Sequence, residues 1–232
     1  MTDPVSPAPP VDRRRVLVTG LGVAGGATLW ASGMSGLATA AESAESPESA
    51  AAVTDNGWPV VERPESHRIE GAGSLTVPVL DGDVATVLLH VLRRFHYEIT
   101  TLDKGEVTGH TTTSQKITEP YESNYRSGTA VAILPGMYPV GAKGGFFPNE
   151  LTVIRDILAD CEGVVRWGGD EKVPKEGHFE IAVKPGDARL ARTARKIAAW
   201  GRAPGEGAGS IDATASERRR AAKALERRQK AA

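Results

Sequence analysis

Apolar residues recur at three- and four-residue steps through the segment 83–95, and together they form one face of a helix. Asp83 stands at the start of this stripe and suits the first helical turn, so the pattern predicts a core helix over 83–95. His90 lies off the stripe and His96 follows its end. We therefore expect both histidines on a polar face or at the helix end, and not as metal ligands. The stripe comprises Val84, Val87, Leu88, Val91, Leu92 and Phe95.

Similar periodicity predicts two further helices, at about 148–161 and 187–200. Pro148 is tolerated in a first helical turn, and Gly163 follows the last periodic residue of the earlier helix. Short apolar or alternating runs predict strands at 97–102, 107–110, 130–134, 164–167 and from 178 onward. The sequence therefore predicts an α+β domain, in which a small, mainly antiparallel sheet packs against helices.

The first forty residues differ in character from the predicted domain. Arg13, Arg14 and Arg15 precede an apolar run that is rich in glycine and alanine, and 38–40 supply the small residues that a signal peptidase requires. Many glycine, serine and threonine residues interrupt the run, which argues against a membrane anchor. We expect a twin-arginine-type signal at 1–40 and a bacterial protein that is exported, either extracellular or associated with the cell wall.

Composition divides the remainder into three parts. The segment 41–57 is acidic, rich in small residues and without periodicity, which predicts a disordered linker before a folded domain at 58–200. Residues 201–214 are rich in glycine, and 216–232 form a basic helical tail without an apolar stripe. Such a tail is either solvated or a site of contact with anionic wall polymers or lipid surfaces.

Charge and cysteine content narrow the function classes. The formal net charge of -1 and the sequence pI of about 6.5 give no general attraction to nucleic acid, and we expect no nucleic-acid partner. Cys161 is the single cysteine, so the chain has neither an intrachain disulfide nor a cysteine-rich zinc site. We expect this thiol to be a small core residue.

Two separated stretches carry the candidate chemistry. The first reads Ser-Asn-Tyr-Arg-Ser-Gly-Thr-Ala-Val-Ala-Ile over 123–133, and the second runs from Trp-Gly-Gly-Asp at 167–170 to Lys-Glu-Gly-His-Phe-Glu-Ile at 175–181. The pair resembles the core of the zinc D-alanyl-D-alanine carboxypeptidases, the VanY-like group whose fold is shared with hedgehog domains. The resemblance covers about 84–200. It implies the hedgehog-type arrangement for the predicted α+β domain.

The resemblance also implies a chemistry, because the family holds zinc with two histidines and an aspartate and uses a neighbouring acid as the base. His178 matches one histidine ligand. Tyr125 stands at the position of the other histidine, Ala132 at that of the aspartate and Lys175 at that of the acid. A phenol with a pKa of about 10 is a poor zinc ligand at neutral pH, and alanine cannot bind a metal.

We therefore expect a degenerate member of this group, without catalytic activity and without a cofactor. Such a domain would use its cleft as a binding module for a peptidoglycan stem peptide or an envelope protein. The expected contacts are Tyr125, Arg126, Trp167, Lys175 and His178.

Two alternatives remain. An active zinc peptidase of the D-alanyl-D-alanine carboxypeptidase type would need a rebuilt site, with Glu176 as the acid, His178 as a metal ligand, and His110 or another histidine recruited to the metal. The other alternative is a structural envelope protein with a vestigial cleft.

Overall fold

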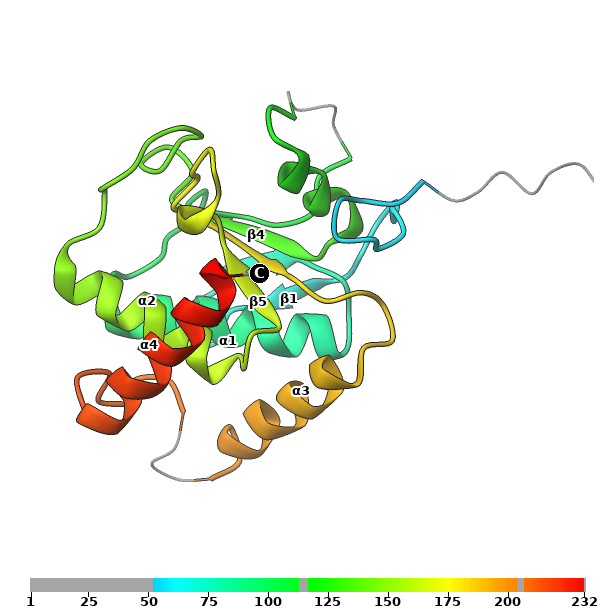
Figure 1. Cartoon of the computed structure of the whole chain (residues 1–232). Helices are drawn as coiled ribbons and strands as arrows, with labels where there is room; N and C mark the ends of the chain where they lie inside the picture. Colours follow the sequence, from blue (N-terminus) through cyan, green and yellow to red (C-terminus); the bar gives the residue numbers. More distant parts are fainter. Residues whose placement is uncertain (1–51, 113–116, 204–206, 232) are drawn as a thin grey trace, which may run out of the picture. The chain divides into compact units, whose positions relative to one another are not determined.

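The computed structural model describes residues 52–112, 117–203 and 207–231 (Figure 1). All of them belong to one compact unit that spans 47–232, so this unit extends beyond the predicted domain limits of 58 and 200. The predicted export signal and positions 41–51 of the predicted linker lie outside the described residues. Residues 52–57 are ordered, since Val53 pairs with Pro59 and Thr54 is buried. Among the described residues, no helix has the length and apolar character needed to cross a membrane.

The described residues form an α+β fold with two antiparallel sheets. The larger sheet has the strand order β3-β4-β6-β5, in which β3 is Val107–Thr108, β4 is Ala130–Ile133, β5 is Val165–Trp167 and β6 is His178–Ile181. The smaller sheet pairs β1, Ser66–Arg68, with β2, Thr76–Pro78. The sequence pattern did not predict this second sheet, because strands of three residues are too short to show a period.

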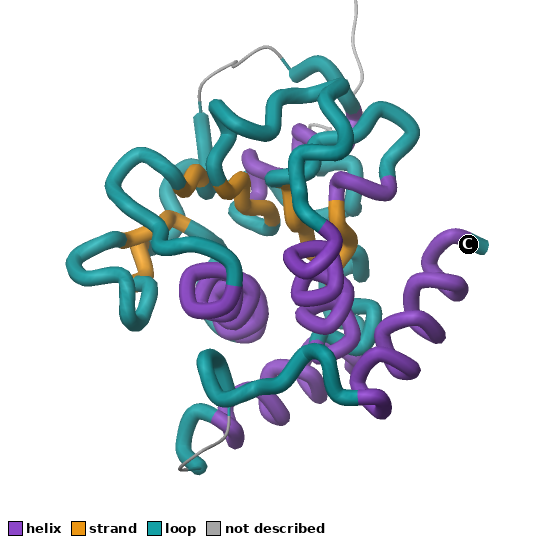
Figure 2. Tube along the Cα trace, turned by 90° about the vertical axis from the view of Figure 1, so that its left-hand side faces the viewer, coloured by secondary structure: helices purple, strands orange, loops and turns teal. Residues whose placement is uncertain are grey.

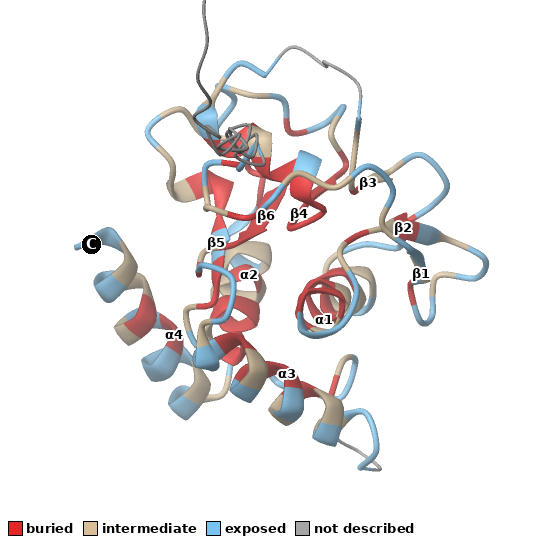
Figure 3. Ribbon diagram, turned by 90° about the vertical axis from the view of Figure 1, so that its right-hand side faces the viewer, coloured by how far each residue is buried: buried red, intermediate tan, exposed pale blue. Residues whose placement is uncertain are grey.

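In the part of the chain that the structure describes, four α-helices accompany the sheets: α1 at Asp83–Glu98, α2 at Pro148–Asp160, α3 at Ala188–Trp200 and α4 at Ser216–Lys230. Helices α1 and α2 lie against one face of the larger sheet, while α3 packs on α1 and α4 packs on α2 (Figure 3). Figure 2 shows the strands gathered on one side of these helices. A 3-10 helix, η1, at Pro120–Ser127 contacts β4 on the side of the sheet away from the helices (Figure 1). A second one, η2, is Gly168–Asp170.

Two predictions around α1 were wrong. The expected strand at 97–102 does not form, because α1 continues to Glu98 and Ile99 still donates its N–H to the carbonyl of Phe95. The side chain of Arg94 bonds Glu98 one turn later, which favours the longer helix. His90 is buried and not on a polar face, since α3 covers that side of α1 and places Trp200 against its ring.

The C-terminal helix also differs from its expectation. Although α4 lacks a continuous apolar stripe, Ala222 and Leu225 are buried on the side that faces α2. Arg218 pairs with Asp156 and Asp160 of α2, and these ion pairs hold the helix against the domain.

Candidate functional site

Helix η1 and the two central strands bring three of the candidate positions together. Tyr125 lies near the end of η1, and Gly128 ends this helix in the left-handed region at φ 67°, which turns the chain into β4. A side chain at position 128 would also collide with the backbone of Leu80, so only glycine fits there. In the next strand, Ala132 is the direct partner of His178 in the register of β4 and β6.

Both nitrogens of the His178 ring are engaged inside the protein. The hydroxyl of Tyr125 lies 2.7 Å from Nδ1, and Oε2 of Glu180 lies 3.0 Å from Nε2. The Glu180 carboxylate can only accept, so it fixes the proton of a neutral imidazole on Nε2. Nδ1 then carries the lone pair and accepts the proton of the Tyr125 hydroxyl. The electron pair that a metal ligand would use is already bound.

Burial strengthens this arrangement. His178 is 0% exposed and Glu180 is 1% exposed. Burial and the negative charges of Glu122 and Glu180 raise the pKa of Tyr125 well above its usual value, so its hydroxyl keeps its proton. The ring of Tyr121 covers His178 at 4.9 Å between centroids. The hydrogen bond between Tyr125 and His178 is therefore enclosed within the protein.

Asn124 completes the cluster, and sequence reasoning did not select it. Its Nδ2 donates to Oε2 of Glu180 at 2.6 Å, and its Oδ1 accepts from the backbone N–H of Asn56 at 3.0 Å. The side chain is 0% exposed. No periodicity or motif distinguishes this asparagine from a surface residue, because its partners are far away in sequence. The side chain of Asn124 thus connects η1 to β6 and to Asn56.

Lys175 lies at the edge of the cluster, paired with a carboxylate that the sequence did not point to. Its Nζ is 2.8 Å from Oε1 of Glu122 and 4.9 Å from the centre of the Tyr125 ring. Burial raises the pKa of Glu122, but the bonds from Lys175 and from the N–H groups of Thr118 and Glu119 outweigh it and lower that pKa. Lys175 therefore neutralises the carboxylate of Glu122.

The remaining candidates have different surroundings. Glu176 is buried, and its two oxygens accept the N–H groups of Gly144 at 2.8 Å and Gly145 at 2.7 Å. These bonds fix the loop before α2 and engage both oxygens of the carboxylate. Trp167 is 3% exposed and donates its indole N–H to the carbonyl of Glu176, while Arg126 is exposed.

The described residues do not assemble a metal site around His178. Their only group of three possible ligands is Glu65, His67 and Asp81, in and beside the β1-β2 sheet, with ligand atoms within 4.8 Å of one another. His110 is instead hydrogen-bonded to the carbonyl of Val61 at 2.8 Å. The side chains near His178 therefore do not fit a catalytic zinc ion, which needs three protein ligands and an open position.

The chain was compared with known protein families, curated proteins and solved structures. Neither the family models, nor the curated proteins, nor the solved structures include a match to this chain.

Proposed function

We propose that this chain is an exported cell-envelope protein whose α+β domain has the hedgehog-type arrangement of the D-alanyl-D-alanine carboxypeptidases. In this proposal the domain is not catalytic and binds a peptide, namely a peptidoglycan stem or a segment of an envelope protein. Support comes from one observation above all: the Nδ1 lone pair of His178 accepts the hydroxyl of Tyr125 at 2.7 Å.

In this proposal, the hydrogen bond from Tyr125 to His178 takes the place of the bond between the histidine and the metal in the resembled family. Tyr125 occupies a ligand position of the resembled family, and its hydroxyl binds the nitrogen that would otherwise face the ion. Ala132 lies opposite His178 without a ligand atom, and Lys175 adds positive charge, which disfavours a cation nearby. In this proposal the cluster holds no metal ion and activates no water.

The polar groups at the rim suit a peptide carboxylate. Arg126 is exposed, and the Lys175 side chain is 12% exposed beside Tyr125. A guanidinium offers two parallel donors to a carboxylate, and the ammonium of Lys175 can exchange Glu122 for a ligand. Tyr125, Trp167 and His178 are buried and would support the binding surface from beneath, with Arg126 and Lys175 making the direct contacts.

Binding is tested with fluorescent stem peptides that end in D-alanyl-D-alanine, titrated against the folded domain. Lys175→Glu should weaken the complex at least about tenfold, because it replaces a charge-assisted bond with repulsion. Lys172→Glu is the matched control, as this exposed lysine lies in the same loop and has the same charge. Equal losses in both variants would indicate diffuse electrostatics, and absence of binding to stem peptides and to purified peptidoglycan would favour the structural alternative.

Metal content tests the catalytic alternative. After incubation with zinc and desalting, the wild-type protein should retain no ion that depends on His178. Any zinc held by the group at Glu65, His67 and Asp81 should disappear in His67→Ala and persist in His178→Ala. Stoichiometric, chelator-sensitive zinc that is lost in His178→Ala, together with muropeptide hydrolysis, would establish the rebuilt peptidase.

A restored variant tests the proposed arrangement itself. Tyr125→His with Ala132→Asp and Lys175→Glu places the family's ligand and acid types around His178. If these positions correspond to the family's site, this triple variant should bind one zinc ion that His178→Ala removes. A folded triple variant that binds no zinc would contradict the correspondence.

A further inference from the structure

Helix α4 lies along α2 and is held to the domain near both of its ends. Near its start, Nε and Nη2 of Arg218 lie 2.8 Å and 2.7 Å from the two carboxylate oxygens of Asp156, and Nη2 also lies 2.7 Å from Asp160. Near its end, Gln229 donates to the carbonyl of Val165 in β5 at 2.9 Å. Leu225, between them, is 5% exposed. The helix is thus a defined wall and not a loosely attached tail.

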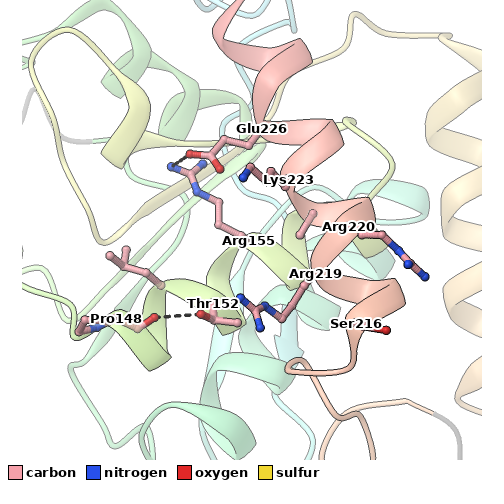
Figure 4. Close-up of a pocket in the computed structure, with 10 residues that line it drawn as sticks. Pro148, Thr152, Arg155, Ser216, Arg219, Arg220, Lys223 and Glu226 are labelled. Atoms are coloured by element: carbon pink, nitrogen blue, oxygen red, sulfur yellow. Dashed lines mark hydrogen bonds and ion pairs between the residues drawn. The ribbon is translucent and has the colours of Figure 1, made fainter.

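A groove of about 560 Å³ lies between α2 and α4. Pro148, Leu151 and the polar Thr152 line it from α2, and Arg219 and Lys223 line it from α4, one helical turn apart. Figure 4 shows Arg219 and Lys223 extending from α4 toward α2, and Arg220 also lines the groove. The volume of the groove falls within the usual range of small-ligand sites, about 300–1,000 Å³.

The charges in this groove are unbalanced. Arg155 on α2 is already neutralised by Asp170 and by Glu226, the latter at 3.3 Å. Within the described parts of the chain, by contrast, no carboxylate oxygen lies within 4.0 Å of Arg219 or Lys223. Two cations held one turn apart on a fixed helix, without partners, form a ready site for an anion.

The chemistry of these cations selects the anion. A phosphate has oxygens on several sides and can accept from a guanidinium and an ammonium at once, whereas one guanidinium already uses both oxygens of a carboxylate. The groove extends between two helices, so an elongated ligand fits it better than a single ion (Figure 4). The apolar lining from Pro148 and Leu151 suits the carbon spacers between charges.

We infer that the α2–α4 groove binds a phosphodiester chain, with Arg219 and Lys223 gripping its phosphates. The sequence alone suggested only general attraction between a basic tail and anionic polymers. The structure limits the attraction to two named side chains and one groove. This inference does not depend on peptide binding near His178, because the two sites share no residue.

The test is calorimetric titration of the full chain with a short poly(glycerol phosphate) at fixed, near-physiological salt. Arg219→Ala with Lys223→Ala should weaken binding at least about tenfold, since two charge-assisted contacts are lost. Arg227→Ala with Arg228→Ala removes the same charge from exposed residues of the same helix outside the groove, and should weaken binding less than about threefold. Thermal unfolding of both variants verifies that α4 stays in place.

Three results would overturn the inference. They are equal losses in the two double variants, equally tight binding of a polyglutamate of matched length, and failure of the wild-type protein to bind poly(glycerol phosphate). Vesicles of phosphatidylglycerol in phosphatidylcholine are the second arm. Binding to such vesicles without binding to the soluble polymer would show a membrane surface as the ligand and would also reject the groove. Stem-peptide affinity, measured in parallel, should be unchanged in both double variants.

Discussion

Two buried polar clusters in this protein have opposite compositions. Around His178, on the sheet face next to η1, hydrogen bonds join a phenol, an imidazole and an amide to one carboxylate, that of Glu180. Between α1, α2 and α4, the cluster is ionic: the fully buried Arg94 contacts Asp156 and Asp160 at 2.8 Å each.

The two clusters differ in the kind of interaction that holds them together. The ionic cluster joins three helices that are distant in sequence, and each of its charges has an opposite charge at contact distance. In the His178 cluster, the hydroxyl of Tyr125 and the carboxylate of Glu180 engage both nitrogens of the ring. In this protein, burial alone therefore does not indicate that a polar residue is functional. Its position in the fold is the better indicator.

Breaking the ionic cluster should have the largest effect. Arg94→Met leaves Glu98, Asp156 and Asp160 buried with less compensation, so we expect a loss of about 3–5 kcal/mol in the free energy of unfolding. Urea titration followed by circular dichroism measures the loss. Arg93→Met is the control, because the partner of Arg93, Glu70, is 71% exposed, and its loss should stay below about 1 kcal/mol. Similar losses in the two variants would contradict a special role for the buried cluster.

Opening the His178 cluster should cost less. Tyr125→Phe leaves Nδ1 of a fully buried imidazole without a donor, which should lower the free energy of unfolding by up to about 3 kcal/mol. Tyr121→Phe removes a hydroxyl that bonds the carbonyl of Val173 instead, so it controls for the loss of a phenol group. If Tyr121→Phe is the more destabilising change, the proposed pairing of Tyr125 with His178 contributes little.

Acid should weaken the ionic cluster selectively. Burial raises the pKa of Asp160, but the nearby ring of His90 and the guanidiniums of Arg94 and Arg218 lower it to about 2. This folded-state pKa lies below the unfolded value of about 3.9, so the stabilisation is complete above about pH 5 and is lost as the pH falls toward 2. We expect about 2 kcal/mol to disappear in that window.

Unfolding measured at several pH values between 5 and 2 tests this. Asp160→Asn should flatten the acid limb, whereas Asp103→Asn, at an exposed aspartate, should leave it unchanged. An acid limb of the same size in Asp160→Asn would assign the effect to other carboxylates.

The sequence predicted the helices better than the strands, and the reason is length. The stripe from Val84 to Phe95 spans more than three helical turns, and α1 buries it fully. The segment 97–102 has only a brief alternation. Its first two residues belong to α1 instead, which extends to Glu98 and is supported there by the Arg94–Glu98 pair. The β1-β2 sheet left no detectable period.

The candidate site was predictable only in part for a related reason. A motif can mark Tyr125, Ala132, Lys175 and His178, and the structure does bring these four positions together. No motif could reveal that Asn124 bonds Glu180. Such partners are determined by tertiary contacts, which local sequence patterns do not predict.

The docking of α4 also constrains how the domain is made during synthesis. Arg218 supplies an opposite charge to Asp156 and Asp160, and Gln229 satisfies a carbonyl of β5. Until residues 216–230 leave the ribosome, Asp156 and Asp160 of α2 lack Arg218 as a partner, and the carbonyl of Val165 lacks Gln229. The nascent domain should therefore stay susceptible to proteases and depend on chaperones until its last helix is complete, and only then reach its final stability.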